Sequence, residues 1–143
     1  MQKINIKKIT WISFVLLLLS ACSKDNTGLD VQVSYQFIAD KTWYLDYAQT
    51  TTGTTTNTRT YLGQPTYFIN YLKNLSTTDS DGLIGVYSIK QTGNKLQIQV
   101  AAKTLSGNNS NYTYEIESLG ARNMILSYVN NNVTTQLFFS TQK

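Results

Sequence analysis

The sequence predicts an all-β fold in which about eight antiparallel strands follow one another up and down. Apolar residues recur at every second position through the C-terminal half of the chain, which is the pattern of a strand with one buried face. Short runs rich in Asn and Gly separate these segments at hairpin spacing. Proline occurs once, at Pro65, and the strand-favouring residues Thr and Tyr are abundant.

Residues 1–21 have the features of a secretory signal peptide, with Lys3, Lys7 and Lys8 ahead of an apolar run from Ile9 to Leu19. This run of about eleven residues is too short to span a bilayer core of roughly 30 Å as a helix. The sequence Leu-Ser-Ala directly before Cys22 resembles the lipobox of bacterial lipoproteins. The resemblance implies that the Cys22 thiol is acylated, as with palmitate, and that Cys22 becomes the mature N-terminus.

A lipobox implies an address in the cell envelope, at the outer membrane, with the protein facing either the periplasm or the cell surface. Each buried CH₂ of an acyl chain contributes about 0.8 kcal/mol, so two chains give stable attachment. We expect residues 22–39 to comprise the lipidated cysteine and a flexible tether, and residues 40–143 to form one barrel domain. The alternative is that Cys22 is only a small residue near an ordinary cleavage site.

The elements of the N-terminal half are expected in the following order. Residues 31–38 have an apolar spacing that fits either a short helix or a first strand, and residues 42–51 read as a strand led by Trp43. The Thr-rich residues 50–60 fit either a long hairpin or a mobile loop. Residues 66–72 read as another strand, and residues 74–82 as a polar loop.

The C-terminal half is predicted to be a meander of hairpins. The turn sequences are Gln91-Thr92-Gly93-Asn94, Gly120-Ala121-Arg122-Asn123 and Asn130-Asn131-Asn132. Between them, four stripes of alternating residues mark the inward faces of four strands: Leu96, Ile98 and Val100; Tyr112, Tyr114 and Ile116; Met124, Leu126 and Tyr128; and Val133, Thr135, Leu137 and Phe139. Glu115 and Glu117 fall on the opposite face from the tyrosine stripe and are expected to face water.

These elements resemble the small lipocalin-like domains of Gram-negative lipoproteins. The resemblance covers residues 40–142 and rests on Thr42-Trp43-Tyr44-Leu45, on the hairpin from Gly85 to Ile98, and on the aromatic closing strand near Phe139. It implies that the meander closes into a β-barrel. Lys41 stands where lipocalins usually carry Gly, and no Arg that would cover the Trp from a late strand is identifiable.

Catalytic equipment is scarce in this chain. It contains no His and one Cys, which excludes imidazole catalysis and His-bound metals. Asp79-Ser80-Asp81-Gly82 resembles the start of a calcium loop, but turn chemistry accounts for it. Three of the twelve basic side chains leave with the signal peptide, and the nine that remain against eight acidic ones give no reason to expect a nucleic-acid partner. We therefore expect neither an enzyme nor a cofactor.

The ten tyrosines are the most distinctive feature of the composition. A tyrosine ring with its hydroxyl suits a ligand of mixed polarity and also suits an ordinary barrel wall. The first functional hypothesis is a non-enzymatic, lipid-anchored module that binds a small apolar or amphipathic ligand in the barrel or at its mouth, with the candidate wall residues Trp43, Tyr67, Tyr87, Tyr112, Tyr114 and Tyr128. The alternative is an interaction lipoprotein that serves an envelope complex through its outer surface, with an interior filled by side chains.

Overall fold

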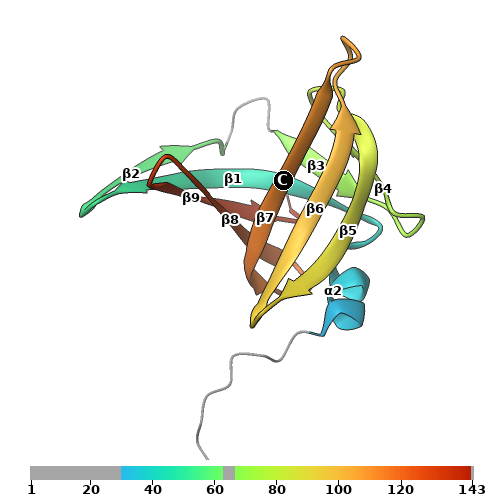
Figure 1. Ribbon diagram of the computed structural model, residues 1–143, viewed down its shortest axis with the longest axis horizontal. Helices are drawn as coiled ribbons and strands as arrows, with labels where there is room; N and C mark the ends of the chain where they lie inside the picture. The colour runs from blue at the N-terminus through green and yellow to red at the C-terminus, as the bar shows by residue number, and fades with distance from the viewer. Residues whose placement is uncertain (1–29, 63–66, 143) are drawn as a thin grey trace, which may run out of the picture.

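The computed structural model describes residues 30–62 and 67–142, so Cys22 and the predicted signal peptide lie outside the described residues. Within the described residues, one short helix precedes a set of β-strands (Figure 1). The elements are α2 (Val31–Ile38), β1 (Lys41–Thr52), β2 (Thr55–Thr60), β3 (Phe68–Tyr71), β4 (Ser76–Asp79), β5 (Ile84–Thr92), β6 (Lys95–Lys103), β7 (Asn109–Leu119), β8 (Asn123–Asn130) and β9 (Val133–Ser140).

The strands form a closed antiparallel barrel, which confirms the predicted all-β meander. Neighbours follow chain order from β3 to β9, and β1 closes the ring by pairing with β3 on one edge and β9 on the other. Eight strands make up the barrel, and β2 is an extra strand outside it. Closure leaves the eight barrel strands without a long unpaired edge.

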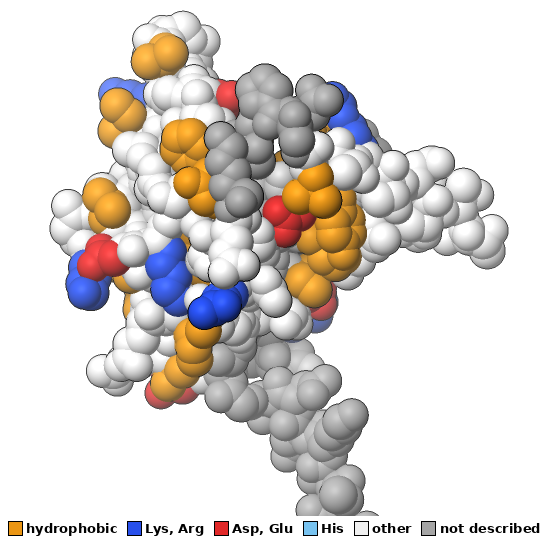
Figure 2. Space-filling model, turned by 180° about the vertical axis from the view of Figure 1, so that it is seen from behind, with side chains coloured by type: hydrophobic (Ala, Val, Ile, Leu, Met, Phe, Trp, Pro, Cys, Tyr) orange, Lys and Arg blue, Asp and Glu red, His pale blue; other side chains and the backbone are white. Residues whose placement is uncertain are grey.

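A β-bulge in β1 lets this strand form part of the barrel and also part of a projecting hairpin. We call this hairpin, residues 47–60, the arm. Residues 41–44 pair with β3, the register shifts between Leu45 and Tyr47, and the residues from Tyr47 to Thr52 pair with β2. The Thr-rich segment is thus a hairpin, one of the two forms that the sequence left open. The arm bears almost no hydrophobic or charged side chains on the face seen in Figure 2, where it projects to the right.

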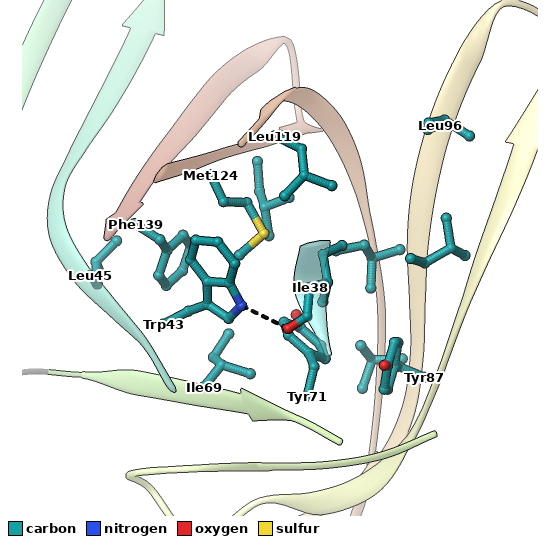
Figure 3. Close-up of a cluster of buried hydrophobic side chains, with 14 of the residues drawn as sticks. Ile38, Trp43, Leu45, Ile69, Tyr71, Tyr87, Leu96, Leu119, Met124 and Phe139 are labelled. Atoms are coloured by element: carbon teal, nitrogen blue, oxygen red, sulfur yellow. Dashed lines mark hydrogen bonds between the residues drawn. The ribbon is translucent and has the colours of Figure 1, made fainter. Parts of the chain in front are cut away.

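Helix α2 closes one end of the barrel. The Asp30 side chain caps the helix by accepting a hydrogen bond from the Gln32 amide at 2.9 Å. The Trp43 indole, fully buried, donates to the carbonyl of Ile38 at 3.1 Å (Figure 3). Lys41 lies over the Trp43 ring, with its Nζ 5.6 Å from the ring centroid. Residues 31–38 of the predicted tether segment therefore pack against the barrel.

The barrel core runs from this closed end toward the middle of the barrel. Every residue of the Leu96, Ile98 and Val100 stripe is buried, as predicted, and so are Met124 and Leu126. A bulge in β7 between Ile116 and Ser118 shifts the alternation, so that Leu119 is buried instead of Ser118. The prediction of a polar loop over residues 74–82 was wrong, because β4 lies within it and pairs with β3 and β5.

Candidate functional site

Tyrosine side chains gather at the end of the barrel opposite α2, which we call the mouth. Tyr112 and Tyr114 project from β7, and their ring centroids lie 5.0 Å apart. Tyr128 of β8 continues the row, 5.6 Å from Tyr114, and is 37% exposed. Tyr67, just ahead of β3, is half-buried on the other side of the barrel. Alternation along the strands therefore directs phenol rings from separate strands into one space.

Asp79 supplies a carboxylate to the same mouth, at the end of β4. Its Oδ2 accepts a hydrogen bond from the Tyr67 hydroxyl at 3.0 Å. Its Oδ1 accepts from the amides of Asp81 and Leu83, each at 2.9 Å, which fixes the turn after the strand. The ion pairs found among the described residues are Lys73–Asp40 and Lys95–Glu115, so no cation in this part of the chain pairs with Asp79.

Two buried tyrosine hydroxyls lack a hydrogen-bond partner among the described residues. They belong to Tyr71, which is fully buried, and to Tyr112, which is half-buried. The Tyr71 ring packs edge-on against Tyr87 at 4.8 Å. A buried polar atom without a partner costs about 1–3 kcal/mol, so native proteins rarely retain one without a reason.

The buried tyrosines stay protonated far above neutral pH. Burial, followed by the neighbouring Tyr128 and the carboxylate of Asp79, raises the pKa of Tyr114 to about 12. Burial, followed by the influence of Tyr35, raises the pKa of Tyr87 to about 12. The pKa values of Tyr67, Tyr71 and Tyr112 are also raised, with burial as the largest cause. These hydroxyls are therefore neutral hydrogen-bond donors at physiological pH.

The predicted wall residues divide into two groups by their position in the barrel. Tyr67, Tyr112, Tyr114 and Tyr128 meet at the mouth. Trp43 and Tyr87 are buried below it, and their polar atoms are already engaged, with Ile38 and with the carbonyl of Leu72 at 3.1 Å.

Tyr71 and Asp79 were not among the predicted site residues. Tyr71 lies within the strand predicted over residues 66–72 and ends β3, and its alternation with Ile69 is the signal that would have placed it inside the barrel. Asp79 carried only a turn signal in the sequence. Its meeting with Tyr67 depends on the pairing of β3 with β4, which the sequence analysis missed.

The outer face of the barrel carries an open groove across β5, β6 and β7. Its volume is about 530 Å³, and an adjoining groove of about 430 Å³ shares the lining residues Val86, Ala101 and Asn111. Val86 and Ile84 on this face are 57% and 64% exposed. The grooves combine exposed aliphatic side chains with amide and hydroxyl groups.

Comparisons of the chain with protein-family models, with curated proteins and with solved structures return no match. The described residues contain no helix long and apolar enough to cross a membrane. Within the same residues, no three His, Cys, Asp or Glu side chains gather in a way that could hold a metal ion.

Proposed function

We propose that this protein is a non-enzymatic, lipid-anchored protein of the cell envelope that binds a small amphipathic ligand at the tyrosine-lined mouth of its barrel. The observation that carries the proposal is the pair of unpartnered hydroxyls of Tyr71 and Tyr112. A ligand with a polar group would satisfy these hydroxyls and offset the cost of burying them. Apolar parts of the same ligand would lie against the rings of Tyr114 and Tyr128.

The lipid anchor would leave the mouth open to its surroundings. The N-terminal chain enters the barrel domain through α2, at the closed end (Figure 1). Between Cys22 and Asp30 the chain reaches at most about 3.5 Å per residue, so an acylated Cys22 would hold the closed end near the membrane. The mouth would then face away from the bilayer and receive its ligand from the aqueous side.

Nuclear magnetic resonance of protein labelled at the tyrosine ζ carbons tests this proposal with hexan-1-ol as the probe. The ζ-carbon signals of Tyr71, Tyr112, Tyr114 and Tyr128 should shift in a saturable way as the alcohol is added. Tyr47 serves as the internal control, because it stacks on Phe138 at 4.2 Å on the outer face of the barrel. Equal shifts at Tyr47, or no shifts at the mouth, would contradict the proposal.

The outer groove favours a second candidate function, that of an accessory subunit in an envelope complex. Exposed aliphatic side chains beside polar groups are typical of surfaces that meet another protein. A Val86→Asp substitution would place a charge in the groove without touching the mouth. Suppose that Val86→Asp releases a partner that copurifies from the native envelope, while hexan-1-ol does not shift the ζ-carbon signals of the mouth tyrosines. This second function would then replace the first.

A further inference from the structure

We propose that the ligand of the mouth is an amphipathic organic cation, whose alkylammonium head is held by the Asp79 carboxylate and the surrounding tyrosine rings. This inference rests on the proposed function and specifies the chemistry of the ligand. It follows from three features: a carboxylate that no described Lys or Arg neutralises, neighbouring aromatic rings, and the unpartnered buried hydroxyls of Tyr71 and Tyr112.

The Asp79 carboxylate is held in place but not neutralised. Two backbone amides and the Tyr67 hydroxyl fix its orientation through the three hydrogen bonds given above. The Oδ1 atom accepts from both amides, whereas Oδ2 accepts only from Tyr67 and keeps a further acceptor site. Asp79 is partly buried, and no described Lys or Arg lies within ion-pair distance. A cationic ligand would supply the missing charge in a partly desolvated place, where ion pairs are stronger than in water.

The tyrosine rings suit the same head group. A cation is attracted to the face of an aromatic ring within about 6 Å of its centroid, and recognition of alkylammonium groups by several aromatic rings is a common use of this effect. Tyr112, Tyr114 and Tyr128 present neighbouring rings 5.0 and 5.6 Å apart, inclined to one another by 53° and 57°. Rings inclined in this way do not stack flat, so their faces point in different directions.

The basic side chains at this end of the molecule do not compete for the carboxylate. Arg59 of the arm lies over the Tyr61 ring, 5.1 Å from its centroid. Lys103 follows the buried Ala102 and is exposed on the opposite face of β6. Asp79, by contrast, is close enough to raise the pKa values of Tyr67, Tyr112 and Tyr114, although burial is the largest cause for each. The charge that acts on the mouth is therefore negative.

Three probes with the same six-carbon chain separate charge from hydrophobicity: hexyltrimethylammonium, hexan-1-ol and hexanoate. We expect the full chain to bind the cation at the mouth at least about tenfold more tightly than either other probe, as measured by the tyrosine ζ-carbon shifts. Equal binding of the three probes would overturn the inference and leave the proposed function standing. Absence of binding by all three would overturn both.

Two variants, each lacking one carboxylate, test whether Asp79 is the residue that raises the affinity for the cation. Asp79→Asn keeps an oxygen to accept from the Asp81 and Leu83 amides, and it should lower the affinity for the cation about tenfold while leaving that for hexan-1-ol unchanged. Asp81→Asn removes the same charge from the exposed turn two residues away and should leave both affinities unchanged. Equal losses in the two variants would reduce the effect to long-range charge and overturn the inference.

A substitution of one aromatic side chain keeps the inference testable if the Asp79→Asn variant does not fold. Tyr128→Leu removes a partly exposed ring and keeps an apolar side chain at the rim. It should weaken binding of hexyltrimethylammonium several-fold more than binding of hexan-1-ol, since only the cation gains from the ring face. Equal weakening of both probes would contradict a role for the rings in recognising charge.

Discussion

At the scale of single residues, substitution of Tyr71 tests the proposed ligand site against a merely packed core. The residue is fully buried, and its hydroxyl has no partner among the described residues. Tyr71→Phe removes the hydroxyl and keeps the ring, so the free energy of unfolding of the ligand-free protein should rise by about 1 kcal/mol. Urea unfolding measures this change.

Tyr87→Phe is the matched control for Tyr71→Phe. The Tyr87 hydroxyl donates to the Leu72 carbonyl at 3.1 Å, so its removal should lower the free energy of unfolding by about 1 kcal/mol. The two substitutions delete the same atom from neighbouring rings and should act with opposite signs. A loss of equal size in both would mean that the Tyr71 hydroxyl is satisfied without a ligand.

Trp43 is the residue on which the closed end depends most. It is fully buried against Met124, Phe139 and the end of α2 (Figure 3). Trp43→Ala should lower the free energy of unfolding by about 3–5 kcal/mol, because it leaves a large cavity and an unpaired Ile38 carbonyl. Trp43→Phe should lose clearly less in the same urea experiment. A loss near zero for the alanine variant would contradict the position of β1 in the core.

At the scale of elements, the close approach of β5 and β6 near the mouth depends on a glycine. A Cβ at Gly85 would lie 2.5 Å from the Ala101 carbonyl oxygen and 2.5 Å from the Ala102 Cβ. Gly85→Ala should therefore lower the free energy of unfolding by about 1–3 kcal/mol. Gly120→Ala is the control, because its nearest such contact is 3.8 Å and its backbone does not adopt a positive φ. Similar effects in both would contradict the β5–β6 register.

Sequence reasoning located the strands with alternating apolar residues and missed the strand without them. In β4 the fully buried position is Thr77, whose hydroxyl donates to the Asn70 carbonyl at 2.9 Å. A buried threonine between Ser76 and Thr78 has the composition of a loop, so nothing in the pattern distinguished it. Apolar spacing alone does not identify the helix at residues 31–38, since it fits both a helix and a strand, whereas the Asp30 cap favours the helix.

The candidate site was only partly predictable for a related reason. Alternation correctly placed Tyr112, Tyr114 and Tyr128 on inward faces, because β7 pairs with β6 and β8 pairs with β9 in unbroken register. The hydrogen bond between Tyr67 and Asp79 joins residues at or beside the ends of the short strands β3 and β4. No local sequence pattern predicts that these two strands pair. The position of a side chain along the barrel axis could not be predicted either. Trp43 lies at the closed end and packs in the core, although its residue type also fits the wall of a binding site.

At the scale of the whole molecule, the buried tyrosines should make the free energy of unfolding fall as the pH becomes alkaline. Tyrosine in the unfolded chain has a pKa near 10, whereas burial raises the pKa of Tyr87 and Tyr114 to about 12. Above about pH 10 the unfolded state loses protons that the folded state retains, so the free energy of unfolding falls. The tyrosine contribution should be complete below pH 10 and lost as the pH rises through about 12.

Urea unfolding at a series of pH values from about 8 to 12 measures this dependence. Tyr114→Phe should make the alkaline fall in stability less steep, because one buried hydroxyl no longer titrates. An unchanged slope in that variant would assign the fall to other groups, such as lysines, and would contradict the burial of Tyr114.

The proposed lipid anchor also concerns the whole molecule, and Cys22 lies outside the described residues. Cys22→Ala removes the only thiol in the chain and should move the protein from the membrane fraction to the soluble fraction. Ser23→Ala, one residue later, should leave it in the membrane fraction. If the Cys22→Ala variant stayed with the membrane, the lipoprotein interpretation would be wrong.

Mass spectrometry of the protein from its native envelope, recorded under native and then denaturing conditions, is the decisive test for a bound ligand. We expect a small cationic molecule that stays bound in the native spectrum and is absent from the denatured one. The Tyr114→Ala,Tyr128→Ala double variant should lose this molecule. A native spectrum without a bound small molecule, or one in which the double variant retains it fully, would contradict a ligand at the tyrosine-lined mouth.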